Sequence, residues 1–243
     1  MEVADRVHRL HDGIVNFYLV EDGGRLVLVD AGGVRHWDLL LRILASIGRR
    51  LEDLDAVVLT HAHSDHTGFS ERARTEVDAA VHVHAADAEA ARTGRTGKAE
   101  AGYGRYLLRL EAYRTLFTLG RAGALKIVPI EVVSAFDDGQ TIDVPGRPRA
   151  VHVPGHTEGS CSIIFEDRRA VVTGDCLVTR NPFTGRVGPQ IMPAGLNEDS
   201  ARALRSLDAL STLPADAILP GHGDPWNGDM AEAVRLATSA GTS

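Results

Sequence analysis

The chain has 243 residues, of which 44% are hydrophobic, and it carries a net charge of −7 at pH 7. This length and composition suit one sizeable core, so we expect residues 1–243 to form a single domain. The acidic balance argues against a nucleic-acid partner, because binding a phosphate backbone requires clustered Lys and Arg.

Cellular location is inferred from features that the sequence lacks. No apolar run approaches a membrane span, and the first residues do not form a charged region followed by an apolar one. Cys161 and Cys176 cannot build a disulfide framework, and each stands in an apolar, strand-like segment where we expect it to be buried. We therefore expect a cytoplasmic protein without a membrane partner.

The first predicted elements lead to a cluster of potential metal ligands. Residues 16–20 and 25–29 read as a hairpin around a Gly-Gly turn, and a helix is expected from about Trp37 to Ile47. The apolar run 56–59 then predicts a strand. Within the seven residues that follow it stand four potential ligands, His61, His63, Asp65 and His66.

The spacing of these four residues indicates metal chemistry. Imidazoles two residues apart at the end of a strand can converge on one ion, while Asp65 and His66 point further round the turn towards a second. The alternative, an exposed His-rich loop without a function, is disfavoured because further ligand types follow downstream in a similar setting.

The region from about residue 85 to 126 is predicted to be a helical insertion. It starts with a polar, Gly-rich loop over residues 91–98 and continues as a helix. Tyr106, Leu110, Tyr113 and Phe117 share one stripe of that helix. Two interpretations remain open: a surface helix packed on the core, or a cap that covers the metal cleft and shapes an apolar pocket.

Three more candidate ligands each follow a short apolar run. His156 comes after residues 150–153, Asp175 after 170–172 and His222 after 217–219. A site at the carboxyl ends of sheet strands has this pattern, because loops there carry the chemistry on a rigid scaffold.

The remaining stretches are assigned as loops and helices. Residues 179–193 contain three Pro and two Gly, so we expect an irregular loop near the cleft, either structural or supplying Arg180, Phe183 and Arg186 to a substrate. Asn197 is predicted to cap a helix over about 198–210, and Asp229 to cap the closing helix 230–237.

Taken in order, the motifs resemble those of the metallo-β-lactamase superfamily. They are Asp30, His61-x-His63-x-Asp65-His66, His156, Asp175 and His222. The resemblance implies an α/β fold, the four-layer αβ/βα sandwich, here with the helical insertion at about 85–126. It also implies a dinuclear site, with His61, His63 and His156 on one metal, Asp65, His66 and His222 on the other, and Asp175 bridging them. Asp30 matches the structural aspartate of the family.

The cofactor implied by the resemblance is two Zn²⁺ ions, and five imidazoles with two carboxylates suit zinc while remaining compatible with iron or manganese. We expect a hydrolase of a small-molecule acyl bond, a thioester or lactone before a lactam, in which a metal-bridging hydroxide attacks the carbonyl. Asp65 is the expected catalytic residue, orienting the nucleophile and carrying its proton to the leaving group.

Single features of the sequence argue against some other activities of the superfamily. Glyoxalase II holds glutathione with a helical C-terminal domain, whereas only 21 residues follow His222 here. Quorum-quenching lactonases carry Tyr three residues after the bridging Asp, where this chain has Val178. The main alternative resembles the persulfide dioxygenases, with a single iron on His61, His156 and Asp175. A catalytically idle metal-binding scaffold is a third interpretation.

Overall fold

The computed structural model describes residues 1–106 and 108–242, with only the backbone for Tyr103 and Arg105. Its strands are β1 (Glu2–Ala4), β2 (Val7–His11), β3 (Asn16–Asp22), β4 (Arg25–Val29), β5 (Leu54–Val58), β6 (Ala80–His84), β7 (Ser134–Phe136), β8 (Arg149–His152), β9 (Cys161–Phe165), β10 (Ala170–Gly174), β11 (Val178–Arg180), β12 (Val187–Gln190) and β13 (Ala217–Pro220). Its helices are α1 (Trp37–Ser46), α2 (Ser64–Thr67), α3 (Ser70–Val77), α4 (Ala88–Thr93), α5 (Leu110–Ala122), α6 (Ser200–Ser206) and α7 (Met230–Ala240). Short 3₁₀ helices occupy Val34–His36, Leu51–Asp53, Ala85–Asp87, Tyr103–Tyr106, Glu166–Arg168 and Leu207–Leu210.

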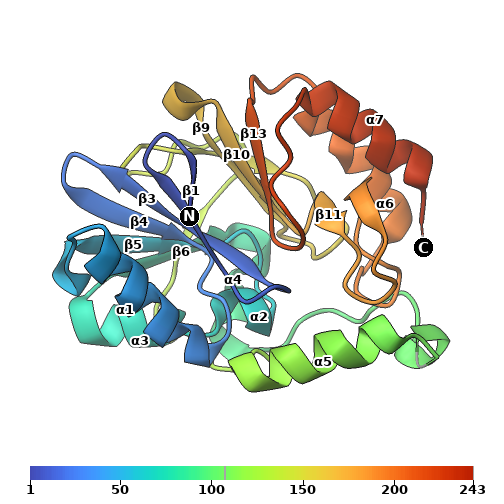
Figure 1. Ribbon diagram of the computed structural model, residues 1–243, viewed down its shortest axis with the longest axis horizontal. Coiled ribbons are helices and arrows are strands. Elements are labelled where there is room, and N and C mark those ends of the chain that lie inside the picture. Colours follow the sequence, from blue (N-terminus) through green and yellow to red (C-terminus); the bar gives the residue numbers. More distant parts are fainter. Residues whose placement is uncertain (107, 243) are drawn as a thin grey trace.

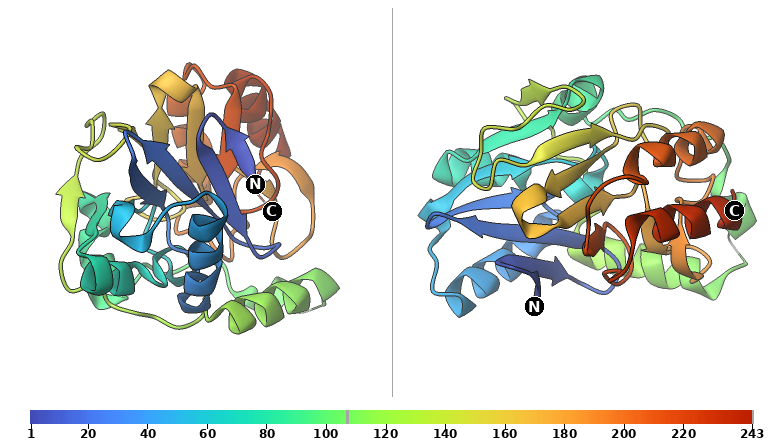
Figure 2. Two further views of the ribbon diagram at one scale, coloured as in Figure 1. Left: turned by 60° about the vertical axis from the view of Figure 1, so that its left-hand side comes forward. Right: turned by 90° about the horizontal axis from the view of Figure 1, so that it is seen from above.

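The strands form two main sheets, which face each other in the middle of the molecule (Figure 1). The first has seven strands in the order β1 to β7, antiparallel from β1 to β4 and parallel from β4 to β7. The second has the order β13-β10-β9-β8, in which β10 and β13 run parallel. Helices α1 and α3 lie outside the first sheet, and α6 and α7 outside the second (Figures 1 and 2).

Successive side chains of a strand point to opposite faces of the sheet, and this alternation divides the apolar side chains among three cores. On β4, Leu26 and Leu28 pack towards α1 and α3, whereas Val27 and Val29 face the second sheet. A third core fills the space between the second sheet and helices α6 and α7. Helix, sheet, sheet and helix layers therefore stack as the predicted αβ/βα sandwich, and the predicted fold class is confirmed.

Several local predictions are confirmed. The hairpin forms as β3 and β4, α1 covers the expected residues, and Asp229 caps α7 by accepting a hydrogen bond from the backbone N–H of Glu232. Cys161 and Cys176 are both buried. Among the described residues, no helix is both long enough and apolar enough to cross a bilayer.

One local prediction is wrong, and another is refined. Most of residues 179–193 is irregular, as predicted, but β11 and β12 pair there as a short antiparallel ribbon. The helix after them begins at Ser200, and its cap is Asp199, whose carboxylate accepts the backbone N–H of Arg202. Asn197 does not cap this helix, and its side chain instead forms a hydrogen bond with a histidine of the candidate site.

Candidate metal centre

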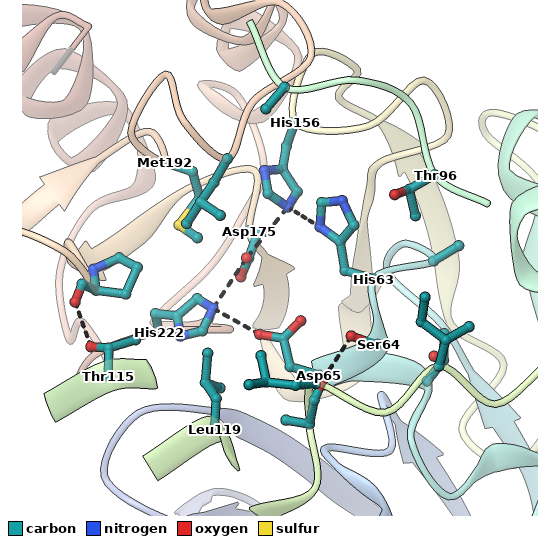
Figure 3. A pocket seen from close by; sticks show the side chains of 18 of the residues that line it. His63, Ser64, Asp65, Thr96, Thr115, Leu119, His156, Asp175, Met192 and His222 are labelled. Carbon is teal, nitrogen blue, oxygen red and sulfur yellow. Dashed lines mark hydrogen bonds and ion pairs between the residues drawn. The ribbon is translucent and has the colours of Figure 1, made fainter. Parts of the chain in front are cut away.

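The seven predicted ligands gather on loops at the carboxyl ends of strands from both sheets. The loop after β5 and the short helix α2 supply the first four, His61, His63, Asp65 and His66. His156 follows β8, Asp175 comes directly after β10, and His222 lies two residues after β13. Figure 3 shows His63, Asp65, His156, Asp175 and His222 pointing towards one another from these separate segments. Topology thus brings together residues that lie up to 161 positions apart in the sequence, from His61 to His222.

Three histidines form the first cluster of donor atoms. Nδ1 of His63 lies 2.9 Å from Nε2 of His156, which lies 3.2 Å from Nε2 of His61. Their rings meet edge to face, with interplanar angles of 76–88°. The three nitrogens therefore converge on one point, as ligands of a single ion would.

Asp65, His66 and His222 form the second cluster, and Asp175 lies between the two. Oδ2 of Asp65 is 3.8 Å from Nε2 of His66 and 3.6 Å from Nε2 of His222. Oδ2 of Asp175 is 3.4 Å from Nε2 of His156 and 3.2 Å from Nε2 of His222. Its carboxylate therefore contacts a member of each cluster, which is the position of a bridging ligand.

A second layer of partners orients the imidazoles through their other ring nitrogen. Nδ1 of His156 donates to Oδ1 of Asn197 at 3.1 Å, and Nδ1 of His222 donates to the carbonyl of Ile14 at 2.7 Å. These bonds select the tautomer that leaves Nε2 as an acceptor towards the cluster.

Asp30 orients the imidazole of His66 in the same way. Its Oδ2 accepts from Nδ1 of His66 at 2.8 Å, and its two oxygens also accept from the backbone N–H and the hydroxyl of Thr60. Asp30 has a left-handed backbone with φ of 63°, a conformation that Asp tolerates better than most residues. The predicted structural aspartate therefore lies where it joins β4 to the ligand loop.

Close backbone approach at the centre depends on one glycine. A Cβ added at Gly221 would collide with Oδ1 of Asp175 and come within 2.8 Å of Cε1 of His66. Gly221, directly before His222, therefore lets the loop after β13 pass close to the bridging carboxylate.

The protonation states of the first cluster suit metal binding. Burial lowers the pKa of His61, His63 and His156, and with the neighbouring His63 it lowers that of His156 to about 3. Neutral imidazole is the form that binds a metal. Burial would raise the pKa of Asp175, but the nearby His222 and His66 hold it well below its usual range, so its carboxylate is ionised.

Two buried polar atoms at the centre test whether these residues fit a metal. Nε2 of His66 and Oδ1 of Asp175 lie 3.5 Å apart, and neither has a hydrogen-bond partner among the described residues. Buried polar atoms without partners are rare and costly, and both of these are donors that transition metals accept. The residues present therefore fit a metal centre.

Asp87 joins the two loops that carry the first cluster. Its Oδ2 accepts the backbone N–H of Ala62 at 3.0 Å and the hydroxyl of Thr157 at 2.7 Å, and its Oδ1 accepts the backbone N–H of Gly159 at 2.8 Å. Ala62 stands between His61 and His63, and Thr157 follows His156. The sequence offers no signal for this role, because Asp87 lies in the insertion, far from any ligand motif.

We expect Asp87→Asn to lower the affinity of the first cluster for zinc by roughly 10- to 100-fold. The amide would place an NH₂ group against one of the N–H donors, so one loop would lose its bond. Competition for zinc with a chromophoric chelator measures the change. Asp199→Asn is the matched control, because Asn caps a helix as well as Asp does. Equal affinity in the Asp87 variant and the wild type would contradict this role.

A cavity of about 530 Å³ opens beside the ligands. His63, Asp65, His156, Asp175 and His222 line one wall, and most of the rest is apolar (Figure 3). Other lining side chains come from the insertion and the residues just after it, from the loop between β11 and β12, and from the segment after β12. They include Tyr106, Leu116, Leu119, Leu125, Ile127, Phe183, Met192 and Leu196. The insertion therefore forms part of the cavity wall.

Of the four residues of the predicted stripe, only Tyr106 lines this cavity. Tyr106 lines it and is 5% exposed, but it ends a 3₁₀ helix that precedes α5. Tyr113 and Phe117 are 54% and 67% exposed on the outer side of α5. Thr115 and Leu119 form the inner side instead. The insertion lines the cavity, which favours the cap over a plain surface helix, but the prediction that Tyr113 and Phe117 form its wall is wrong.

Of the three residues proposed as substrate contacts near β11, only Phe183 lines the cavity. Arg180 forms an ion pair with Glu111 of α5 beside a second, smaller pocket. Arg186 is exposed and reaches the carbonyl of Ala240 at 3.4 Å. Neither arginine therefore supplies a charge to the cavity wall in this structure.

Residues 11–222 match the family model of the metallo-beta-lactamase superfamily. The chain belongs to this superfamily. It is a metal-dependent hydrolase, in agreement with its similarity to YflN, a probable metallo-hydrolase of Bacillus subtilis. YflN is 26% identical over 236 residues, which cover 93% of this chain and 87% of the relative.

Two further proteins resemble the chain. MBLAC2 of Homo sapiens, an acyl-coenzyme A thioesterase, is 26% identical over 232 residues, which cover 92% of this chain and 77% of the relative. The crystal structure of TTHA1429, a metallo-beta-lactamase family protein from Thermus thermophilus, superposes with a TM-score of 0.69 at 25% identity. That match covers 96% of this chain and 78% of the solved one.

Proposed function

We propose that the chain is a dinuclear zinc hydrolase that cleaves the thioester of an apolar acyl group. The observation that carries the proposal is the cavity in which the ligand clusters meet an apolar wall. The similarity to an acyl-coenzyme A thioesterase supports the same reaction class.

The chemistry of the wall supports a neutral acyl group. Among the described residues that line the cavity there is no Lys or Arg, and the two acidic ones are Asp65 and Asp175. The hydroxyl of Ser64 donates to the carbonyl of Ala124, and that of Thr115 to the carbonyl of Pro182. A β-lactam antibiotic carries a carboxylate, and burying it against the apolar wall, away from the metal ligands and without a Lys or Arg to pair with, would be costly. An apolar acyl chain incurs no such cost.

Each residue of the site would have a distinct role in this reaction. His61, His63 and His156 would hold one zinc ion, Asp65, His66 and His222 the other, and Asp175 both. When bound, the ions supply a nucleophile at neutral pH and polarise the acyl carbonyl. Asp65, whose side chain is 19% exposed towards the cavity, would take up a proton and return it to the departing thiolate.

Metal content and substrate preference test this function together. The purified protein should carry two zinc ions per chain and should hydrolyse acyl thioesters faster than lactones or β-lactams of matched size. One iron per chain with oxygen consumption would instead support the persulfide dioxygenase-like alternative. A preference for lactones would agree with the proposed metal site but would change the proposed substrate from a thioester to a lactone.

The cavity wall makes a prediction that a matched pair of tyrosines can test. Tyr106→Ala should lower kcat/KM for substrates with long acyl chains, by an amount that corresponds to about 1–3 kcal/mol of lost transition-state stabilisation. The kcat/KM for substrates with short acyl chains should fall less. Tyr113→Ala is the control, because Tyr113 faces away from the cavity. Soluble thioesters of increasing chain length, assayed beside metal content and a thermal melt, give the comparison. Equal losses for all chain lengths would indicate a structural role for Tyr106.

A further inference from the structure

Exposed apolar side chains gather on one part of the insertion. Of the eleven large hydrophobic residues that are exposed in the described chain, seven lie between residues 108 and 127. They are Leu108, Leu110, Tyr113, Leu116, Phe117, Leu125 and Ile127. Leu116, Leu125 and Ile127 also line the cavity, whereas the other four do not. Soluble monomers rarely concentrate apolar surface in this way unless the surface binds something.

Helix α5 carries the centre of this surface on its outer side. Leu110 and Phe117 lie two turns apart, and each is 67% exposed. In Figures 1 and 2 the helix runs along the edge of the molecule, outside both sheets. Its outer side therefore has no protein layer over it among the described residues.

The inner side of α5 is already attached to the body of the protein. Thr115 donates to the carbonyl of Pro182, and Arg35 donates to the carbonyl of Arg121 at 3.1 Å. At the end of the helix, Ser64 donates to the carbonyl of Ala124 at 2.7 Å. Because these bonds hold the helix by its inner side, turning it over to bury the outer residues would break them.

The charges on this segment are mostly positive. Arg109, Arg114, Arg121 and Lys126 are all exposed. The single acidic residue between 108 and 127 is Glu111, whose side chain is only 17% exposed and pairs with Arg180 and, at 3.5 Å, with Arg114. The side chain of Arg114 is still 68% exposed. Cations are thus concentrated beside the apolar side chains in a protein whose net charge is −7.

We propose that the outer side of α5 docks on an anionic lipid surface. The docking face consists of Leu110 and Phe117, which would enter the boundary of the acyl region, and Arg109 and Arg114, which would contact lipid phosphates. Apolar and basic side chains on one exposed helix face are the pattern of interfacial helices. The proposal is independent of the reaction that the cavity catalyses.

A second copy of the chain fits this face less well. Self-association around a two-fold axis would bring the same face of each copy together, and Arg109 and Arg114 would then oppose the cations of the partner. The expected lack of a membrane partner rested on the lack of a spanning run. A helix that lies on the surface needs no such run.

Vesicle flotation tests the docking face with the metal-loaded protein. We expect binding to phosphatidylcholine vesicles in which about one third of the lipid is phosphatidylglycerol, and little binding to phosphatidylcholine alone. Arg109→Gln with Arg114→Gln should weaken binding roughly 30-fold, at about 1 kcal/mol per cation. Leu110→Ser with Phe117→Ser should weaken it roughly 100-fold or more.

The control removes the same residue types from another exposed helix face. Leu41 and Arg42 are both exposed on α1, so Leu41→Ser with Arg42→Gln should leave vesicle binding unchanged. Metal content and thermal melts check that each variant is folded. If the variant with both apolar changes is not folded, the variant with both arginine changes provides the test. Failure of the wild type to bind anionic vesicles, or equal binding to neutral ones, would overturn the proposal. A dimer in sedimentation velocity that the Leu110 and Phe117 changes dissociate, without vesicle binding, would assign the face to a second copy.

Discussion

Asp175→Ala should remove metal and turnover together. The Asp175 carboxylate lies within 3.5 Å of His66, His156 and His222, and so contacts both ligand clusters. Without it, each ion would lose a ligand and the link to its neighbour. We expect bound zinc to fall from two ions to about one per chain and kcat/KM to fall by roughly 10³-fold or more.

Metal analysis and steady-state kinetics on the same preparation measure this result. Asp216→Ala is the control, since Asp216 is an exposed carboxylate beside β13 that pairs with Arg169 at 2.6 Å. A thermal melt separates loss of metal from loss of fold. If the Asp175 variant kept two zinc ions and full activity, the bridging assignment would have to be abandoned.

Asp65→Asn should reduce the rate more than it reduces metal binding at the first cluster. That cluster consists of His61, His63 and His156, whose donor atoms lie 2.9 and 3.2 Å apart and do not include Asp65. An amide cannot carry a proton to the leaving group. We expect about one tightly held ion and a loss in kcat on the order of 10²-fold or more.

The matched control for Asp65 is Asp78→Asn. Asp78 is exposed and has a left-handed backbone, a conformation that Asn also accepts. Measuring kcat with thioesters that have good and poor leaving groups sharpens the test, because a missing proton donor should harm the poor leaving group more. An unchanged kcat in the Asp65 variant would show that another group moves the proton.

The position of the ligands at strand ends was predictable because it depends on local pattern. Apolar runs of three or four residues, each followed within three residues by His or Asp, indicate strands whose ends carry the chemistry. His156, Asp175 and His222 all satisfy this pattern. The residues that position the ligands show no such pattern. Asp87 and Asn197 each act on a loop distant in sequence, so only the folded chain brings them into contact.

The sequence by itself determined the periodicity of the insertion, while the tertiary structure decided its direction. Spacing predicted that Leu110, Tyr113 and Phe117 share one side of a helix, and they do. Periodicity cannot say which side meets the core, because both sides of α5 carry apolar residues. Hydrogen bonds from Thr115 to the loop after β11 and from Ser64 to the end of the insertion hold the other side inward. Those partners come from distant parts of the chain, and they leave the aromatic stripe facing outward.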